Sequence, residues 1–177
     1  WLKGLGYYDA GSRSFYTKQT KIETPEELAG LKIRVRESET AIKMVKQLGG
    51  APTPIAWGEL YTALQQGVVD GAEHNLTNLY LSRPYEIFKY YTLDEHTIIP
   101  DVLLMSTHFW NTLNDTEQQW VQEAADESIV YQRKLWEESE NDAMAALLEA
   151  GVIFTTPNKK LFSNKVRSQL DGKGENK

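Results

Sequence analysis

The chain has 177 residues, a formal net charge of −6 and no cysteine. An acidic chain lacks the basic face that phosphate groups require, which argues against nucleic acid as the main partner. The lack of cysteine excludes disulfide bonds and thiolate metal sites, and no stretch approaches the roughly 18 consecutive apolar residues of a membrane helix. Hydrophobic residues make up 41% of the chain, enough for one sizeable core.

The first predicted elements are two strands and a short helical turn. Residues 1–10 contain apolar and aromatic runs that indicate a buried strand leaving into a loop, and residues 11–22 indicate a strand and a turn. Thr24 then suits a helix N-cap, with Pro25 at the first helical position and Glu27 three residues after the cap. This spacing is a capping box and predicts one short helical turn.

Two strand–helix repeats follow. Residues 31–35 alternate apolar and polar side chains, as a half-buried strand does, and residues 39–48 form an amphipathic helix. Residues 51–57 are predicted to be extended because two prolines exclude a helix. Residues 58–66 return to helix, and Val68-Val69 is predicted to be a minimal buried strand. Such repeats with short connections predict an α/β domain with a largely parallel sheet.

The second half changes character. Residues 76–90 are predicted to be helical with a break near Arg83-Pro84, and residues 96–106 to form one long strand in which Pro100 indicates an edge or a crossover. No glycine or proline occurs from Thr116 to Ala150. A helix or a broken pair of helices there could reach about 50 Å, long enough to lie across two lobes or along a partner. Residues 152–156 indicate a last strand.

Polar side chains gather in the stretch VVDGAEHNLTNLY, residues 68–80. A metal site there is disfavoured, because the three histidines lie far apart and no HxxxH or EF-hand pattern occurs. Asp70 and Glu73 could form a carboxylate pair of the glycosidase type, but three residues around a turn rarely aim two carboxyl groups at one bond. The structural alternative is that Asp70 forms a turn with Gly71 and that Glu73 bonds backbone N–H groups at a helix start.

The arginines indicate binding more directly. Arg34 ends an alternating strand, and a side chain at the carboxyl edge of a parallel sheet points into the crevice where α/β folds bind ligands. Its planar guanidinium suits bidentate recognition of a carboxylate. Arg13 is a second candidate, and for both the alternative is a structural salt bridge. Trp57 is either a core residue or an aromatic plate against a ligand ring.

Several longer motifs resemble one family. TPEELAGLKIRV, LGGAPTPIAWGELYTALQQGVVDGAE, YEIFKYY and LDEHTIIPDVLLMS are together similar to the DctP-type substrate-binding proteins of tripartite ATP-independent periplasmic (TRAP) transporters. The similarity runs from about Asp9 to Phe162. It implies a monomeric, two-lobed periplasmic protein, secreted by a signal peptide absent from this chain, that needs no cofactor and is not an enzyme. Such a protein captures a small organic acid and delivers it to membrane permease subunits.

The resemblance also implies roles for residues. Arg34 falls on the family arginine that clamps the ligand carboxylate, and Arg13 on a second arginine that faces the ligand. Trp57 stands where relatives place an aromatic ring against a sugar. His74 replaces the usual asparagine, so either its imidazole binds the ligand or Asn75 takes over that role. Glu73 is expected to orient Arg34 or a backbone turn.

The details resemble most the branch that binds hexuronates such as glucuronate and galacturonate. One carboxylate would meet arginine, an apolar sugar face would meet Trp57, and the hydroxyl groups would meet Glu73, His74, Asn75 and Asn78. Three alternatives stay open at this point. The ligand could be another acid, such as a dicarboxylate, a 2-oxo acid, sialate or ectoine. The protein could be an enzyme that acts on uronates, or a periplasmic sensor.

The resemblance further implies a domain organisation. Residues 1–95 would form the second, ligand-binding α/β lobe, with a mostly parallel sheet flanked by helices. Residues 96–170 would supply the crossover strand and the long helix that spans both lobes, and residues 171–177 a disordered tail. The N-terminal lobe is then largely missing from this chain. Apolar side chains along Val102–Met105 and the long helix are expected to be exposed or paired with another chain.

Overall fold

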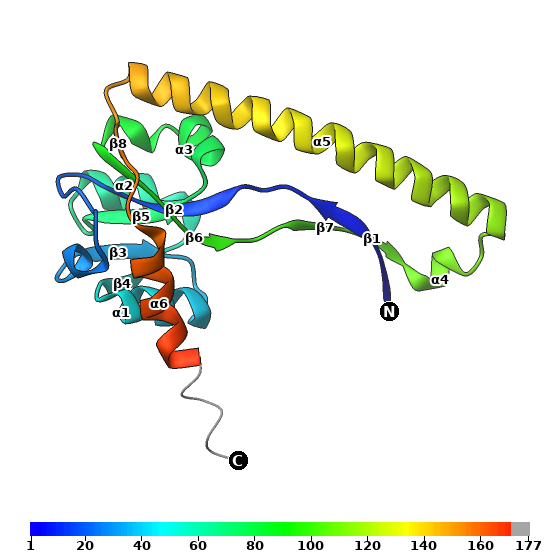
Figure 1. Ribbon diagram of the computed structural model, residues 1–177, viewed down its shortest axis with the longest axis horizontal. Helices are drawn as coiled ribbons and strands as arrows, with labels where there is room; N and C mark the ends of the chain where they lie inside the picture. The colour runs from blue at the N-terminus through cyan, green and yellow to red at the C-terminus, as the bar shows by residue number, and fades with distance from the viewer. Residues whose placement is uncertain (171–177) are drawn as a thin grey trace, which may run out of the picture. The chain divides into compact units, whose positions relative to one another are not determined.

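The computed structural model describes the backbone of residues 1–170 and the side chains of residues 1–167, so the predicted tail lies outside the described residues. The chain forms two compact units (Figure 1). The first contains Trp1–Gly11 and Ile98–Asp142, and the second contains Ser12–Thr97 and the chain from Ala143 onward. This grouping differs from the predicted division between residues 95 and 96. The reason is that the N-terminal strand pairs with a strand that follows Ile98, and not with the central sheet.

The larger unit is built on a mixed six-stranded sheet. Its order is β4-β3-β5-β2-β6-β8. Strand β3 runs parallel to β4 and β5, and β6 runs parallel to β8, whereas β2 is antiparallel to β5. The strands are β2 (Ser12–Thr17), β3 (Lys32–Val35), β4 (Ala51–Pro54), β5 (Gly71–His74), β6 (Tyr90–Ile98) and β8 (Ile153–Thr155).

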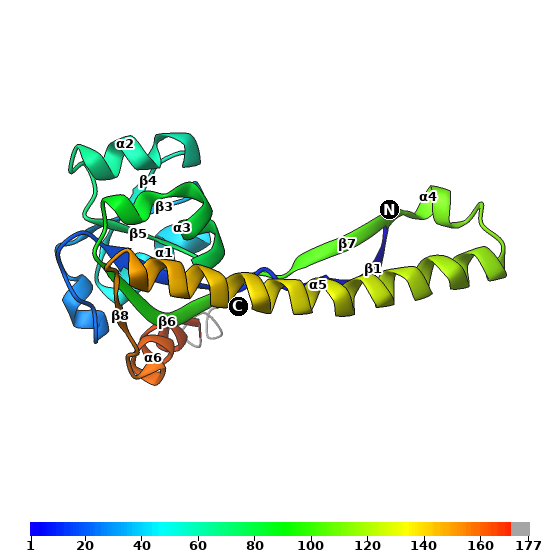
Figure 2. The same cartoon turned by 90° about the horizontal axis from the view of Figure 1, so that it is seen from above.

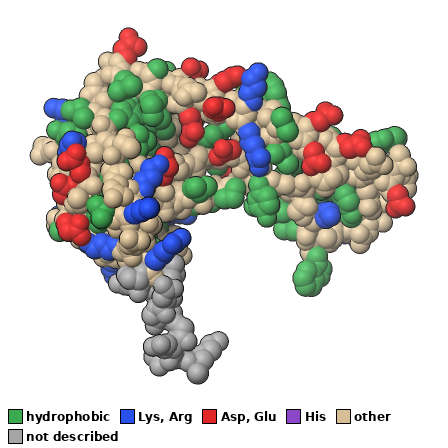
Figure 3. Space-filling view, in the orientation of Figure 1, with side chains coloured by type: hydrophobic (Ala, Val, Ile, Leu, Met, Phe, Trp, Pro, Cys, Tyr) green, Lys and Arg blue, Asp and Glu red, His purple; other side chains and the backbone are tan. Residues whose placement is uncertain are grey.

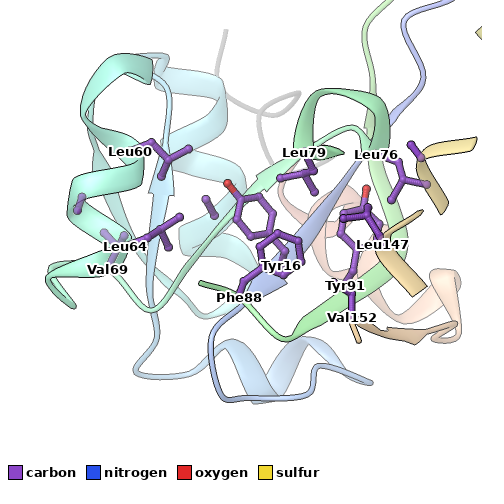
Figure 4. Close-up of a cluster of buried hydrophobic side chains, with 13 residues drawn as sticks. Tyr16, Leu60, Leu64, Val69, Leu76, Leu79, Phe88, Tyr91, Leu147 and Val152 are labelled. Atoms are coloured by element: carbon purple, nitrogen blue, oxygen red, sulfur yellow. The ribbon is translucent and has the colours of Figure 1, made fainter. Parts of the chain in front are cut away.

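Helices cover both faces of this sheet and close two apolar cores. Because alternate side chains of a strand point to opposite faces, the neighbours Phe15 and Tyr16 of β2 enter different cores. Tyr16 packs with residues of α2, α3 and the C-terminal end of α5 (Asp115–Glu149), including Leu64 and Leu147 (Figure 4). Phe15 packs with residues of η1, α1 and α6. The helical segments of this unit are η1 (Pro25–Leu28), α1 (Glu39–Leu48), η2 (Trp57–Glu59), α2 (Leu60–Gln65), α3 (Leu76–Ser82), η3 (Pro84–Glu86) and α6 (Lys159–Leu170).

Several of these elements were predicted from local sequence signals. The predicted helix of residues 39–48 is α1 with the same bounds. The capping box forms before η1, where the backbone N–H of Thr24 donates to Glu27 Oε2 at 2.9 Å. The prediction of a strand at Val68-Val69 was wrong, because neither residue belongs to a strand. Val68 is 47% exposed, and only Val69 is buried as expected. The chain turns at Gly67, which has a φ of +73°, so that β5 starts only at Gly71.

Gly71 allows the close approach of β5 to β2. A Cβ atom added at this position would lie 2.3 Å from the backbone oxygen of Tyr16 and 3.1 Å from the Cα atom of Thr17. Real Cβ atoms do not come this close to backbone atoms, so the antiparallel pairing of Thr17 with Gly71 requires a glycine.

The smaller unit contains a two-stranded antiparallel ribbon and most of a long helix. Strand β1 (Leu2–Tyr8) pairs with β7 (Asp101–Ser106), which leads into α4 (Thr107–Trp110) and α5 (Asp115–Glu149). Figure 2 shows α5 as a single unbroken helix, which resolves the alternative of a broken pair. The predicted long strand 96–106 was wrong, because β6 and β7 are separate strands of different sheets on either side of Pro100.

Much of this smaller unit is apolar and exposed. The prediction that the first strand is buried was wrong, since only one residue of β1, Leu5, is buried. The expected exposure of β7 is found, with Val102 and Leu104 at 47% and 48%. Within the described residues, no helix is both long enough and apolar enough to cross a membrane. The other exposed large hydrophobic residues of this unit are Trp1, Leu2, Tyr7, Ile98, Phe109, Trp120, Val130, Tyr131 and Leu135.

Candidate functional site

Arg34 places a buried guanidinium on the α2/α3 face of the large sheet. Its neighbours on β3, Ile33 and Val35, belong to the opposite core, so the arginine side chain points the other way. The residue is 3% exposed, and its Nε–H donates to the backbone oxygen of Ile55 at 2.8 Å. Burial lowers the pKa of Arg34, but a guanidinium remains charged in proteins. Its terminal nitrogens make no hydrogen bond or ion pair with the part of the chain that is described, so they remain available to a ligand.

Two rings lie beside this guanidinium. The Cζ atom of Arg34 is 5.6 Å from the ring centroid of Trp57, which corresponds to a cation–π contact. The ring centroids of Trp57 and His74 are 4.7 Å apart. Trp57 is 43% exposed, so it is not a core residue. Arg34, Trp57 and His74 therefore form one group, with a charged donor, an exposed aromatic surface and an imidazole.

The tautomer and charge of His74 follow from its contacts. The backbone N–H of Asn75 donates to Nδ1 of His74 at 2.9 Å, so Nδ1 is unprotonated and Nε2 carries the hydrogen. Burial is the main cause that lowers the pKa of His74, to about 4. The imidazole is consequently neutral near pH 7, and its Nε2–H is a hydrogen-bond donor.

Asn75 and Asn78 act together at the start of α3. Asn75 is the N-cap, and its Oδ1 accepts hydrogen bonds from the backbone N–H and from Nδ2 of Asn78, both at 2.9 Å. This contact satisfies one of the free N–H groups of the first helical turn. The oxygen of Asn75 is thus engaged by its own helix.

Arg13 and Glu73 form a second group on the α1/α6 face. Nη2 of Arg13 donates to Oε1 and to the backbone oxygen of Glu73, both at 2.9 Å, and Nε donates to Oε2. Glu73 is 2% exposed. The expectation that Glu73 orients Arg34 was wrong, because the alternation of β5 points the carboxylate away from that side chain and toward Arg13.

His96 and Asp94 extend this second group and were missed in the sequence. Nδ1 of His96 lies 2.6 Å from Asp94 Oδ2, and Nε2 lies 3.8 Å from Glu73 Oε2. Burial lowers the pKa of His96, but Asp94 and Glu73 outweigh it and raise the value to about 9. For Glu73 the directions are reversed: burial raises the pKa of its carboxyl group, but His96 and Arg13 outweigh burial and lower the pKa to about 2. The available signal was the Asp-x-His spacing, which puts both side chains on one face of a strand.

Tyr16 is a further polar group that the sequence did not reveal. It pairs with Ala72 across β2 and β5, and Arg34 pairs with Ala72 from the other side, so the three residues form one row of the sheet. The Tyr16 hydroxyl is buried and has no hydrogen-bond partner in the described chain. Its burial raises the pKa of Tyr16. In the sequence it reads as an ordinary aromatic core residue.

The structure thus separates the predicted site residues into two groups. Arg34, Trp57 and His74 lie together, while Arg13 and Glu73 lie on the other face of the sheet with His96. No group of three or more histidine, aspartate and glutamate residues suited to a metal ion occurs in residues 1–170. The first group offers what an acid with a ring-shaped body needs, namely a guanidinium, an aromatic surface and a neutral donor.

Solved structures with the same fold are solute-binding proteins. A TRAP periplasmic solute-binding protein from Chromohalobacter salexigens, with bound D-glucuronate, has a TM-score of 0.88 and 36% identity, covering 97% of this chain and 57% of that one. One from Sulfitobacter sp. NAS-14.1, with bound β-D-galacturonate, has a TM-score of 0.86 and 37% identity, covering 97% and 57%. The chain therefore has the fold of the corresponding part of the TRAP periplasmic solute-binding proteins.

The family follows from the sequence of the whole chain. Residues 2–175 match the family described as bacterial extracellular solute-binding protein, family 7 (DctP), and the chain belongs to this family. The protein YiiZ of Salmonella typhimurium is 43% identical over 170 residues, which cover 96% of this chain and 52% of the relative. The 2,3-diketo-L-gulonate-binding periplasmic protein YiaO of Escherichia coli is 31% identical, with 96% and 52% covered. The chain spans about half the length of these relatives.

Proposed function

We propose that this chain forms the arginine-bearing part of a periplasmic receptor that captures a hexuronate and delivers it to TRAP permease subunits. The observation that carries the proposal is the Arg34 guanidinium, which is held by Ile55 through Nε and leaves its terminal nitrogens free of protein partners among the described residues. These nitrogens can donate two parallel hydrogen bonds to a ligand carboxylate, and such charge-assisted, bidentate contacts are among the stronger hydrogen bonds in proteins.

The neighbours of Arg34 fit the rest of a uronate. The exposed ring of Trp57 offers a flat apolar surface, on which the C–H face of a pyranose ring can stack. The neutral imidazole of His74 donates through Nε2 to a ring hydroxyl or to the second carboxylate oxygen. A hexuronate combines a carboxylate, an apolar face and hydroxyl groups in one molecule. The similar structures with bound D-glucuronate and β-D-galacturonate support the same ligand class.

The geometry favours binding over catalysis. An enzyme that uses Glu73 and His74 as acid and base would need both side chains on one side of the substrate. They are consecutive strand residues on opposite faces, and the Glu73 carboxylate is held by Arg13. The pKa values of about 2 for Glu73 and about 4 for His74 also lie far below neutral pH, where a general acid or base works best.

Calorimetric titration of the intact protein tests the proposal. D-glucuronate and D-galacturonate are expected to bind more tightly than succinate. Arg34→Ala is expected to abolish hexuronate binding, and Arg34→Lys to weaken it at least about tenfold, because lysine keeps the charge but loses the bidentate geometry. Lys32→Ala, on the same strand and exposed, is the matched control and should bind normally. Unchanged hexuronate affinity in both Arg34 variants would overturn the proposal.

A further inference from the structure

A cavity lies on the other side of the sheet from Arg34 and Trp57. It has a volume of about 430 Å³ and is bounded by α1, by the side chains of Arg13, Glu73 and His96, and by α6. Neither Arg34, Trp57 nor His74 lines it, so it is not part of the proposed hexuronate site. A cavity of this volume lies within the range of small-molecule sites.

The polar lining of this cavity carries an excess of positive charge. Its charged side chains are Arg13, Arg36, Lys43 and Glu73, together with His96. Glu73 is already held by Arg13, and Lys43 pairs with Glu39 at 3.0 Å. The guanidinium of Arg36 has no hydrogen bond or ion pair to any residue that the structure describes. Lysine and arginine side chains gather over the part of the surface where Figure 1 places α1 and α6 (Figure 3). An anion entering here therefore finds an unpaired guanidinium.

His96 adds an independent sign of a ligand. Its side chain is 1% exposed, yet its Nε2 has no hydrogen-bond partner in the described chain, and the residue lines the cavity. Buried polar atoms are normally hydrogen-bonded. This Nε2 has only the Glu73 carboxylate as an ion-pair partner, at 3.8 Å, so its hydrogen bond is left for a group inside the cavity. Apolar groups supply the rest of the wall, from Ala41, Met44 and Val166.

We propose that this cavity is a second ligand site, which takes a small monocarboxylate with an apolar body. The carboxylate pairs with Arg36, and the apolar body lies against Met44, Ala41 and Val166. The combination of one free guanidinium with an apolar wall selects against inorganic anions, which cannot use the wall, and against cations, which the charge repels. This site is distinct from the hexuronate site in residues, in face of the sheet and in ligand chemistry.

Titration of the intact protein with hexanoate tests this site, followed by the methyl NMR signals of methionine. The chain has three methionines, and only Met44 lines the cavity, so Met105 and Met144 serve as internal controls. We expect saturable binding that shifts the Met44 signal alone. Hexylammonium should not bind, and inorganic phosphate should bind at least tenfold more weakly than hexanoate.

Variants separate this site from the hexuronate site. Arg36→Ala is expected to weaken hexanoate at least fivefold, and Thr40→Trp, on the exposed first turn of α1, to block the cavity. Lys46→Ala, on the same helix but outside the cavity, should bind hexanoate normally. Arg34→Ala should lose hexuronate and keep hexanoate. No saturable binding, equal binding of hexylammonium, or loss of hexanoate binding in Arg34→Ala would each overturn the second site.

Discussion

Glu73 and His74 are consecutive residues of β5, but their side chains lie on opposite faces of the sheet. Glu73 lies next to Arg13, and His74 lies in the group that contains Arg34. Glu73 holds Arg13 by two side-chain contacts, whereas the His74 ring lies tilted against Trp57, which contacts Arg34. One short strand thereby supplies a buried ion pair on one face and an imidazole beside Trp57 on the other. The polar cluster that looks like one group in the sequence is two groups in the fold.

The ion pair between Arg13 and Glu73 is expected to matter for stability. Glu73→Gln leaves the guanidinium of Arg13 without its buried counter-charge, and we expect a loss of about 3 to 5 kcal/mol in the free energy of unfolding. Urea denaturation measures this loss. Glu59→Gln, at an exposed position, is the control and should change stability by less than about 0.5 kcal/mol. A loss as small as that of the control would show that the pair does not stabilise the fold.

Loss of the proton from His96 should make stability fall at alkaline pH. Its pKa is about 9 in the folded protein against an ordinary value of 6.5, so the folded state binds the proton more tightly. This stabilisation is fully present below pH 6.5 and is lost as the pH rises through 9. Denaturation at several pH values between 6.5 and 9 should show the decline, and His96→Gln should remove it. The pKa of His74 is lowered to about 4, so His74 does not contribute in this range.

Trp57 should distinguish ligands by shape. Trp57→Ala removes the aromatic surface, and we expect hexuronate affinity to fall about tenfold, a typical value for the loss of one aromatic contact. Succinate has no ring to stack, so its binding should change less. Trp57→Phe keeps an aromatic ring and should restore most of the hexuronate affinity. Equal losses for succinate and hexuronate in Trp57→Ala, measured by calorimetry, would assign Trp57 to the support of Arg34 instead of ligand stacking.

Asn75 should affect folding more than binding. Its side chain caps α3, so Asn75→Ala is expected to cost about 1 kcal/mol of stability, and Asn75→Asp, which keeps the capping oxygen, close to nothing. If the oxygen serves only the cap, Asn75→Asp should also keep the hexuronate affinity of the natural sequence. A large loss of affinity in Asn75→Asp would instead place Asn75 in contact with the ligand.

Elements with strong local signals were predicted well from the sequence. Helix α1 has an apolar stripe and a glycine stop, and α5 has no residue that breaks a helix, so both were recognised. Elements set by tertiary context were not. Val68-Val69 looks like a strand, but the backbone at Gly67 directs it into a turn. Helix α6 was missed, although Asn158 stands before its first residue and accepts a hydrogen bond from the backbone N–H of Lys160 at 3.1 Å. Its Phe162 is buried in the core.

The sequence suggested candidate site residues one by one, but it could not show how they are arranged. Arg34 and Trp57 follow from their places at strand and helix ends, and the structure brings them together with His74. The partner of Glu73 could not be predicted, because it depends on which strand lies beside β5. That neighbour is β2, whose antiparallel pairing sets Arg13 against Glu73. His96 lies 23 residues further along the chain and reaches Glu73 only through the folded sheet.

The glycine at position 71 has a consequence for how this chain tolerates length changes in evolution. An insertion or deletion of one residue within β5 would exchange the two faces, placing His74 against Arg13 and Glu73 beside Trp57. The shift of register would also place a residue with a side chain where Gly71 now lies, against the backbone oxygen of Tyr16, and only glycine fits there. The shifted sheet is therefore destabilised both by unfavourable charge contacts and by steric overlap. We expect insertions and deletions to occur in the turn before β5 and not within the strand.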